Sequence, residues 1–458
     1  MGSGAPAYAS GPSPDSHVLL ASSGGRDSLG ALVCLKRWHA EGRFARLSVV
    51  HVDHGLHPDS PDWARQAREQ AEALGVPVGV RRVEVARGRS GKGRGSLEAA
   101  ARQARYAALD AALDAAREEW PDHPPVLVTA HHAEDQAETV LLALMRGSGG
   151  RGLAGMSPWR PRGLSFHWRP FLDWPRERLG ALAAEAGPAW VDDPSNDDPG
   201  FARNFLRHRV LPELHRFWPD AVGRIDRSAA RLADEQVLLG ELAAEDAGQS
   251  LQQPTLDWPL LAHLSSHRQL NVLRQWLAAQ GVLPPPASRL AEWLAQLRAA
   301  AADRQPCLDW PGGQLRRWGH RLYWLESIPA PVPDRRWPPG EDCLELEDVR
   351  LCRRPAGAGE PATLGHEASA GTPWRVRPVS NSDRIREAPA QPTRRLKNRF
   401  QEAGIPPWER AAAVGIEIGG RLAAVHVAGR WWVEADFRPS DPQSGWSLDL
   451  IRPGGRPG

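Results

Sequence analysis

The sequence predicts an α/β protein in three parts: a domain built on a parallel sheet, a helical middle domain and a small α+β domain near the C-terminal end. In the first part, apolar runs of strand length alternate with longer stretches of helical periodicity. The strand-like runs are 18–21, 47–52, 78–85 and 126–130, and the helical stretches are 29–41, 62–74, 96–117 and 134–146. This alternation is typical of a parallel sheet with helices on both faces, whose ligands bind at the carboxyl ends of the strands.

The later parts of the chain have different patterns. Residues 201–250 and 258–302 follow a helical pattern, and the second block is rich in Leu, Ala and Trp. Near the end, short apolar runs at 416–418, 422–427 and 431–433 are separated by Gly-Gly and Ala-Gly turns, which predicts hairpins. We therefore expect a disordered lead-in (1–15), the sheet domain (16–218), the helical domain (219–328), a linker and irregular segment (329–373) and the α+β domain (374–451).

The turn after the first strand reads SSGGRDS from Ser22 to Ser28. Glycines let backbone N–H groups approach a phosphate closely, and the N-terminus of the following helix adds partial positive charge. The hydroxyls of Ser23 and Ser28 are suited to donate to phosphate oxygens, and Asp27 is suited to hold Mg²⁺ or a cationic group. An ordinary strand–turn–helix corner is the alternative, but the full motif favours phosphate binding. The candidate phosphate-binding residues are Ser23, Gly24, Gly25, Arg26, Asp27 and Ser28.

Two other nucleotide-binding patterns are excluded. The one Gly-Lys pair, Gly91-Lys92, is followed by Gly93, and Ala86 stands where a kinase-type phosphate loop requires glycine. No G-x-G-x-x-G follows a strand, so a dinucleotide-binding fold is disfavoured.

Two more polar groups lie near the expected sheet rim. Asp53 and His54 end the second strand, where they could contact a ribose or base, although a polar strand-end turn is the alternative. On the third helix, Arg102, Arg105 and Tyr106 are spaced to share one face, which on its own is most often a solvated face.

The segment after the fourth strand reads AHHAEDQAET from Ala130 to Thr139. Zinc is disfavoured, because adjacent histidines point apart and no third ligand has metalloprotease spacing. Asp135 and Glu138 lie one helical turn apart at the start of a helix. We expect these two carboxylates to bind a cationic amine.

The net charge is only +2, so a nucleic-acid surface would have to come from local clusters. One arginine track contains Arg203, Arg207, Arg209, Arg216, Arg224, Arg227 and Arg231, and a second cluster contains Arg394, Arg395, Lys397 and Arg399 on an expected helix that ends at Gly404. Such runs are usually solvated faces; two of them beside a phosphate site favour RNA. The glycine-rich basic loop 87–95 is either a linker or an arm for RNA phosphate.

The cysteines and the hydropathy pattern indicate the cellular compartment of the protein. Cys34, Cys307, Cys343 and Cys352 are scattered without a C-x-x-C pair, so a disulfide framework and a structural zinc site are both disfavoured. No apolar stretch reaches eighteen residues and no secretion signal opens the chain. These observations predict a cytoplasmic protein without a membrane segment.

Together, the motifs resemble those of the tRNA(Ile)-lysidine synthetase family, which belongs to the N-type ATP pyrophosphatases with a PP-loop. The matching stretches are SGGRDS, HVDHGL, EAAARQARY, AHHAEDQAETVLLALMRGSG, GLAGM, RPFLDWPRERL, DDPSNDDPGFARNFLRHRVLP and RRLKNRFQEAGIPPWERAA. The resemblance is close over 17–218 and good over 374–435. Glu134 stands where the family commonly has aspartate.

The resemblance implies a ligase that uses ATP and Mg²⁺. ATP activates C2 of the wobble cytidine in a tRNA(Ile) with a CAU anticodon by adenylating the base, and the ε-amine of free L-lysine then attacks C2, giving lysidine, AMP and diphosphate. By this resemblance, Asp27, Arg102 and Arg105 are catalytic, and Asp27 also holds Mg²⁺. The glycine loop, Asp53 and His54 bind ATP, whereas Asp135 and Glu138 bind lysine. The residues implied for tRNA binding are Arg203, Arg207, Arg394, Arg395, Lys397 and Arg399. The resemblance is compatible with a homodimer, and the sequence does not decide the oligomeric state.

Two other functions compete with this one. A tRNA thiolase of the same superfamily usually needs catalytic cysteines, and Cys34 is the one cysteine of the sheet domain, expected inside the first helix. A non-catalytic, nucleotide-sensing RNA-binding protein is the alternative from another class. The intact SGGRDS motif and the acidic cluster disfavour it.

Overall fold

A computed structural model describes residues 11–85, 94–187, 189–191, 198, 200–301, 304–356, 362–365, 372–441 and 445–452. The description does not include the side chains of 94–99. It also leaves out most of the expected lead-in, almost all of the basic loop 87–95 and most of residues 192–199. The chain forms two compact units, Met1–Glu241 and Leu242–Gly458.

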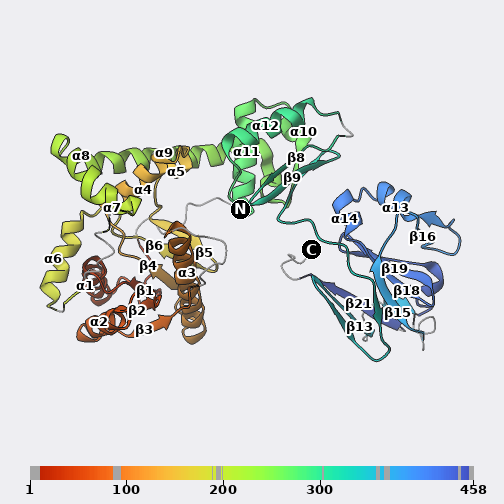
Figure 1. The fold of residues 1–458 in the computed structure, drawn as a ribbon, viewed down its shortest axis with the longest axis horizontal. Helices are drawn as coiled ribbons and strands as arrows, with labels where there is room; N and C mark the ends of the chain where they lie inside the picture. The colour runs from red at the N-terminus through yellow and green to blue at the C-terminus, as the bar shows by residue number, and fades with distance from the viewer. Residues whose placement is uncertain are drawn as a thin grey trace. The chain divides into compact units, whose positions relative to one another are not determined.

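The first unit is built on a six-stranded sheet in the order β3-β2-β1-β4-β6-β5 (Figure 1). Five strands run parallel: β1 (His17–Ser22), β2 (Arg46–Asp53), β3 (Val78–Arg82), β4 (Pro125–Val128) and β6 (Ser165–Trp168). The edge strand β5 (Trp159–Arg162) is antiparallel to β6. The α/β fold expected from the alternating pattern is therefore confirmed, with β3 ending three residues before the expected position.

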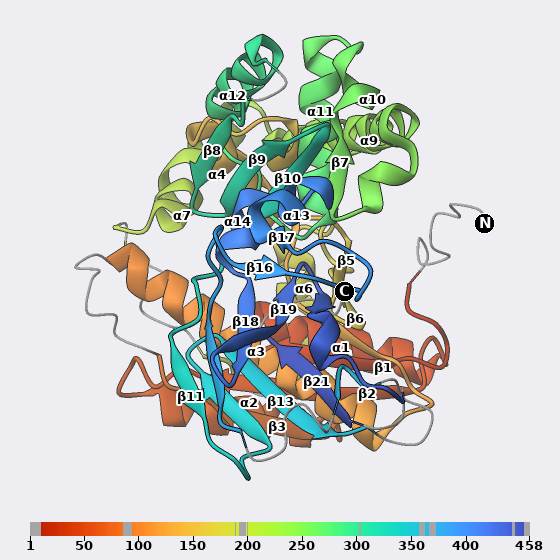
Figure 2. The ribbon, with the colours of Figure 1, turned by 90° about the vertical axis from the view of Figure 1, so that its right-hand side faces the viewer.

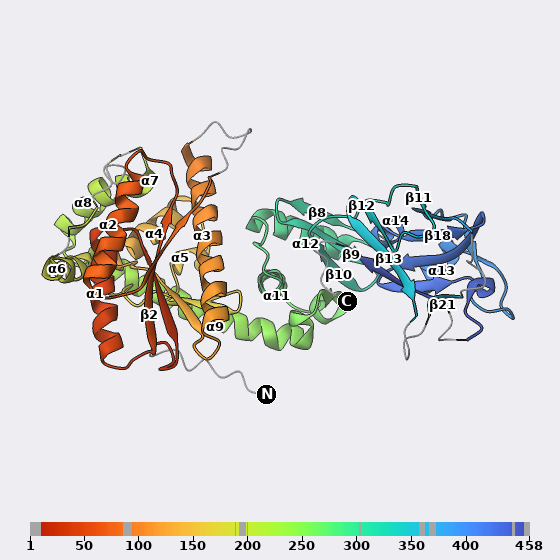
Figure 3. The ribbon, with the colours of Figure 1, turned by 90° about the horizontal axis from the view of Figure 1, so that it is seen from below.

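Helices cover both faces of this sheet (Figure 3). They are α1 (Arg26–Ala40), α2 (Ser60–Ala73) and α6 (Arg176–Ala186) on one face and α3 (Arg94–Glu119) on the other, whereas α4 (Ala133–Met145) packs with the shorter helices that follow it. Successive residues of a strand point to opposite faces. Val18 and Leu20 of β1 accordingly pack in the cluster that contains α1 and α6, whereas Leu19 packs with α3 residues such as Leu109. Residues 18–21 of β1, which pack on both faces, therefore read as a continuous apolar run.

Shorter helices complete the first unit: α5 (Gly150–Leu153), α7 (Ala202–Phe205), a π-helical turn η3 (Leu206–Val210) and α8 (Leu211–Phe217). The long helix α9 (Ala221–Ala247) crosses the boundary between the units. π-Turns are rare and often occur at functional sites. This one contains Arg207.

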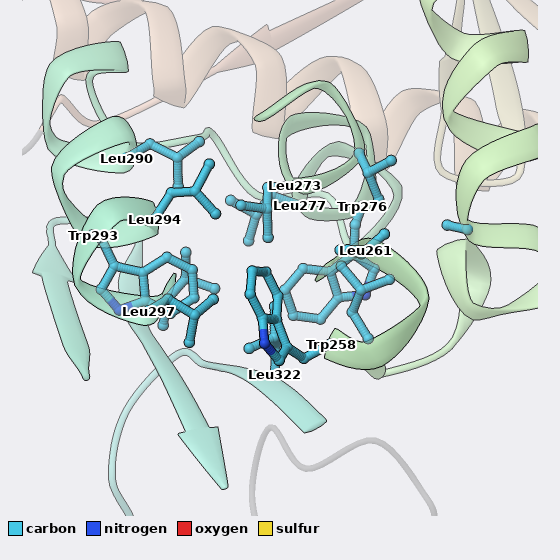
Figure 4. Close-up of a cluster of buried hydrophobic side chains, with 14 of the residues drawn as sticks. Trp258, Leu261, Leu273, Trp276, Leu277, Leu290, Trp293, Leu294, Leu297 and Leu322 are labelled. Atoms are coloured by element: carbon cyan, nitrogen blue, oxygen red, sulfur yellow. The ribbon is translucent and has the colours of Figure 1, made fainter. Parts of the chain in front are cut away.

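The second unit begins with a helical layer and a small sheet. Its helices are η4 (Gly248–Gln252), α10 (Trp258–Ala262), α11 (Ser266–Ala279) and α12 (Ala287–Ala299), which confirms the helical pattern of 258–302. Four strands, β7 (Thr255–Asp257), β8 (Cys307–Trp310), β9 (Gly313–Trp318) and β10 (Arg321–Leu325), form an antiparallel sheet beside the helices (Figure 2). Trp276 and Trp293 from the helices and Leu322 from β10 share one buried cluster (Figure 4). The middle region is thus α+β, whereas the sequence predicted only its helices.

The remaining residues form two further sheets with a small helical cover. The five-stranded sheet contains β11 (Arg335–Trp337), β15 (Trp374–Pro378), β18 (Val414–Ile418), β19 (Arg421–Val427) and β20 (Arg430–Val433). The four-stranded sheet contains β12 (Cys343–Leu346), β13 (Val349–Pro355), β14 (Leu364–Gly365) and β21 (Gly445–Ile451). Helices α13 (Leu396–Glu402) and α14 (Pro407–Ala411), the short pair β16 (Arg384–Ile385) and β17 (Arg394–Arg395), and η5 (Ala435–Phe437) complete it.

The expectation of a linker and irregular segment over 329–373 is therefore wrong for its described residues. Trp337 in β11 is fully buried against Trp374 in β15, and Leu351 in β13 is fully buried too. These strands obtain their partners from residues 374–451, far along the chain. Proline and glycine content reports local turns and cannot show a partner of this kind.

The expectation of no disulfide is also wrong. Cys343 and Cys352 face each other across the β12–β13 hairpin, with their Cα atoms 4.1 Å apart, and form a disulfide. The sequence argument depended on the missing C-x-x-C pattern, whereas the hairpin register pairs cysteines nine residues apart. Cys34 is buried in α1, as expected. None of the helices in the described ranges has both the length and the apolar composition for a membrane crossing.

Candidate functional site

The SSGGRDS turn joins β1 to α1 at the carboxyl-end rim of the sheet. Gly24 has φ +80°, a left-handed conformation that favours glycine. Hydroxyls hold the turn from inside: Ser22 Oγ accepts from the Gly24 N–H at 3.1 Å, and Ser28 Oγ donates to the Gly25 carbonyl at 2.8 Å. Ser23 Oγ accepts from the Gly25 N–H at 3.3 Å. The loop is therefore shaped before any ligand binds, with the N-terminus of a 15-residue helix behind it.

A second layer supports the loop from α2. Gln70 is almost completely buried, and its Nε2 donates to the carbonyls of Gly24 at 2.9 Å and Ala189 at 2.8 Å. The Val191 N–H donates to the Gly24 carbonyl as well, at 3.0 Å. Gln70 could not be predicted from the sequence, because one glutamine on an amphipathic helix gives no signal.

Asp27, in the first turn of α1, lies among cationic side chains. Its Oδ2 is 3.1 Å from Arg176 Nε and 3.6 Å from His132 Nε2, and Oδ1 is 3.7 Å from Arg26 Nε. Burial alone would raise the pKa of Asp27, but the hydrogen bond with His132 and the charge of Arg176 hold it below its usual value. Asp27 is therefore a stable carboxylate next to the glycine loop.

His132 is a buried histidine that lies among three carboxylates, those of Asp27, Glu134 and Asp135. It is buried as the N-cap of α4, with Nδ1 3.0 Å from Glu134 Oε2 and Nε2 3.4 Å from Asp135 Oδ2. Burial alone would lower the pKa of His132, but the hydrogen bonds with Asp27 and Glu134 raise it to about 9. His132 is thus an imidazolium at neutral pH. The sequence analysis considered it only as a metal ligand; its place three residues before Asp135, as in a capping box, was the available signal.

Asp135 and Glu138 are brought together with Arg207. Arg207 Nη2 is 2.9 Å from Asp135 Oδ1, and Arg207 Nε is 2.7 Å from Glu138 Oε1. Arg203 Nε reaches Glu138 Oε2 at 3.2 Å. The side chain of Glu138 is fully buried; burial raises its pKa and the contacts with Arg207 counteract this shift. The two carboxylates expected for lysine and the two arginines expected for tRNA therefore form one ion-pair network.

His54 and Arg105 lie at the end of β2, next to a cleft of about 610 Å³ lined by His54, Leu56, Arg82 and Val85. Arg105 Nε donates to His54 Nε2 at 3.1 Å, and burial together with the Arg105 charge lowers the pKa of His54 to about 4. Asp53 is buried and accepts from the Gly55 N–H at 2.9 Å. Arg102 lies apart from this cleft, with its guanidinium carbon 5.2 Å from the Tyr106 ring centroid.

The C-terminal basic cluster differs from the expected helical patch. Arg394 and Arg395 form β17, and α13 begins only at Leu396, so the expectation that all four cations share one helix is wrong. Arg394 pairs with Glu402 at 2.9 Å, and Arg399 pairs with both Glu387 and Glu402. The turn at 380–383 fixes the start of helix α13, because the Leu396 N–H donates to the Asp383 carbonyl. Arg395 and Lys397 are exposed.

Comparison with known proteins covers nearly the whole chain. Residues 6–214 match the family model of the PP-loop domain, 256–323 that of the TilS substrate binding domain and 374–450 that of the TilS substrate C-terminal domain.

Full-length relatives agree with these models. Three curated relatives are named tRNA(Ile)-lysidine synthase. The protein from Alkalilimnicola ehrlichii is 44% identical over 90% of this chain and 89% of its own. Those from Ralstonia nicotianae and Pseudomonas aeruginosa are 38% and 37% identical, over 88% and 96% of this chain and 87% and 94% of theirs. With its PP-loop sheet domain and both TilS domains, the chain belongs to the tRNA(Ile)-lysidine synthase family.

Proposed function

We propose that this protein ligates free L-lysine to C2 of the wobble cytidine in tRNA(Ile) with a CAU anticodon, through an adenylated cytidine. The products are lysidine, AMP and diphosphate. The observation that carries the proposal is the close position of a glycine loop for phosphate and the carboxylates Asp135 and Glu138, joined through His132 and Asp27. Activation by a nucleotide and capture of an amine need such neighbouring sites.

In the first step, cytidine O2 attacks the α-phosphorus of ATP, and the bond to the β-phosphate oxygen breaks to release diphosphate. The N-terminus of α1, which follows the glycine loop, stabilises the leaving diphosphate. The cleft beside His54 is large enough for the adenosine. Arg105 is the proposed counter-charge for the α-phosphate, since it already lies at this cleft through His54.

The residues at the loop also fit Mg²⁺. This ion prefers oxygen ligands and keeps several waters, so one or two carboxylates beside substrate phosphates are enough. Asp27 supplies a carboxylate of low pKa there; the described residues contain no cluster of three metal-binding side chains. When bound, Mg²⁺ would offset the charge that develops on the diphosphate.

In the second step, the ε-amine of lysine attacks C2, and the bond from C2 to the adenylate oxygen breaks to release AMP. Lysine arrives as an ammonium ion and must lose a proton before it attacks. Asp135 and Glu138 are the carboxylates that we propose to hold this ammonium and to accept its proton. Arg207 bridges them in the structure; an arriving ammonium carries the same charge and would replace part of that bridge.

The later domains are proposed to bind the tRNA, with residues 219–328 and 374–451 contacting its backbone while residues 16–218 perform the chemistry. Backbone contacts position an RNA without reading its sequence. We place the reaction in the cytoplasm, where tRNA is modified with ATP as the energy source.

The test is to incubate the full chain with ATP, labelled lysine and a tRNA(Ile) transcript with a CAU anticodon. Label should enter the RNA, with one AMP released per lysine incorporated. Reactions without ATP and with a tRNA(Met) transcript of the same anticodon are the controls. AMP release without label in the RNA would overturn the ligase proposal and leave only adenylation.

A further inference from the structure

The first unit contains a second cavity, of about 540 Å³, between α3 and the β5–β6 hairpin. Five arginines line it, Arg102, Arg117, Arg160, Arg162 and Arg169, against the two acids Asp110 and Asp114. The steps proposed above do not use this cavity, which we call the arginine pocket. Its composition raises the question of which ligand it binds.

The two acids neutralise only two of the five arginines. Arg117 Nη1 is 2.8 Å from Asp114 Oδ1, and Arg162 Nη2 is 2.7 Å from Asp110 Oδ2. Arg102, Arg160 and Arg169 have no carboxylate partner among the side chains that the structure describes. Among the described side chains, the pocket therefore has three more arginines than carboxylates, in a space the size of a small-molecule site.

Arg169 is the strongest indication that this surplus serves a ligand. Its side chain is buried, with Nη1 donating to the Ser157 carbonyl at 2.8 Å and Nη2 to His167 Nδ1 at 3.0 Å. Its Nε is buried without a hydrogen-bond partner in the described structure. Burial and the positive charge of Arg169 lower the pKa of His167 to about 2. A buried, unneutralised guanidinium is costly, and an anion in the pocket would remove this cost.

A chain of hydrogen bonds connects the pocket to the catalytic rim. Because neutral His167 accepts from Arg169 through Nδ1, its Nε2 carries the proton and donates to Thr129 Oγ1 at 2.9 Å. Thr129 Oγ1 is 2.7 Å from His131 Nδ1, one residue before His132. The pocket is thus connected, across the end of β4, to the segment that carries His132, Asp135 and Glu138.

We propose that the arginine pocket binds a backbone phosphate of the substrate RNA, from a nucleotide neighbouring the reactive one. This inference rests on the proposed function, since it takes RNA as the substrate. A base that reacts at the rim must bring its flanking phosphates past this position, and arginine forks suit phosphate oxygens. ATP itself already has the glycine loop for its phosphates. RNA is therefore favoured over a free nucleotide.

Arg160→Ala in the full chain tests the inference, because Arg160 lies on the edge strand β5 and its loss breaks no described ion pair. The probe is an RNA stem-loop with the CAU anticodon, titrated at several salt concentrations. Affinity should fall about five- to tenfold, and the slope of log Kd against log salt should fall by about 0.7 to 0.9. Arg160→Lys should retain the slope, and ATP affinity without RNA should not change. Arg68→Ala, an exposed arginine on α2, is the matched control.

Unchanged RNA affinity and salt slope in Arg160→Ala would overturn the inference. Weaker binding of inorganic phosphate or ATP with unchanged RNA binding would also overturn it, since the pocket would then be a site for free anions. These titrations need no ligation. A wild-type chain that incorporates no lysine would therefore reject the proposed function separately, while ligation with unchanged RNA binding by Arg160→Ala would reject only the pocket.

Discussion

Asp27 links the glycine loop to the cationic side chains around it. Arg176 comes from α6 and His132 from α4, so one carboxylate connects three elements of the first unit. Its side chain is 23% exposed and lies in a first helical turn, where it contributes little to the core. The position is therefore open to a substitution that removes chemistry without unfolding the domain.

Asp27→Ala should lower tRNA-dependent AMP release by about 100-fold or more, because the carboxylate that we propose for Mg²⁺ and that contacts His132 is lost. AMP formation is measured by chromatography and folding by circular dichroism. Glu72→Ala, an exposed carboxylate on α2, is the control and should behave as wild type. Normal AMP production by a folded Asp27→Ala protein would reject the role of Asp27.

Glu138→Gln should raise the KM for lysine about tenfold and change the KM for ATP much less, because a neutral amide no longer attracts an ammonium or holds Arg207. Steady-state kinetics with each substrate varied in turn measure the two values. Equal changes in both KM values would show that Glu138 only supports the structure around Arg207.

His132 predicts a pH-dependent stability. Its pKa is about 9 in the folded protein, above the unfolded value near 6.5. The stabilisation is therefore complete below about pH 6.5 and is lost as the pH rises through about 9. Urea unfolding of wild type and His132→Gln should differ by about 3 kcal/mol at most near pH 6, and the difference should shrink toward pH 10. A difference that stays constant over this range would contradict a charged His132.

At the scale of elements, Gly30 allows α1 to pack closely on α6. A Cβ at position 30 would lie 2.1 Å from the Leu179 carbonyl oxygen, which is backbone and has little room to move. Close approach of this kind requires glycine. It also fixes the direction of α1, whose first turn carries Asp27.

Gly30→Ala should therefore reduce the free energy of unfolding by about 2–3 kcal/mol and weaken ATP binding. Calorimetry and nucleotide titration measure the two effects. Gly240→Ala on α9 is the control, because a Cβ there meets nothing within 4 Å. That change should stabilise by up to about 1 kcal/mol. Equal stability of the two variants would mean that α1 and α6 separate easily.

Elements that repeat a local pattern could be predicted from the sequence, whereas those defined by a distant partner could not. The strand at 18–21 is buried on both faces and reads as an apolar run, so β1 and the loop after it were found. β5 and β6 are four residues each and include arginines and histidine, so no apolar pattern marks them. β11 pairs with the distant β15, and β13 and β14 pair with the distant β21.

The same limit applies to the site. Ser23 to Ser28 are contiguous, and their position between the first strand and the first helix could be predicted from the motif alone. The pairing of Arg207 with Asp135 and Glu138 joins residues 69 or more positions apart through a π-turn. From their spacing in the sequence, the carboxylates and Arg207 were assigned separate roles, and only the fold shows that they form ion pairs.

At the scale of the whole molecule, the net charge of +2 leaves tRNA binding to cations that lack acidic partners. Many arginines are already neutralised, such as Arg350 by Glu345 at 3.0 Å and Arg375 by Asp334 at 2.6 Å. A paired guanidinium releases fewer counterions when it meets a phosphate, since its charge is already compensated. Exposed cations outside such pairs should therefore determine the salt dependence.

In the second unit, the double variant Arg395→Ala/Lys397→Ala removes two exposed cations near α13. It should weaken tRNA binding about tenfold and lower the salt slope by about 2, close to 0.9 for each phosphate contact, with ATP affinity unchanged. Filter binding across a salt series measures both quantities. Arg350→Ala/Arg375→Ala removes the same charge from the same unit but takes it from ion pairs, so its slope should stay near that of wild type. If the salt slope of tRNA binding is the same in both double variants, Arg395 and Lys397 form only a solvated face. The slope would then depend on the total charge alone and not on which arginines or lysines are removed.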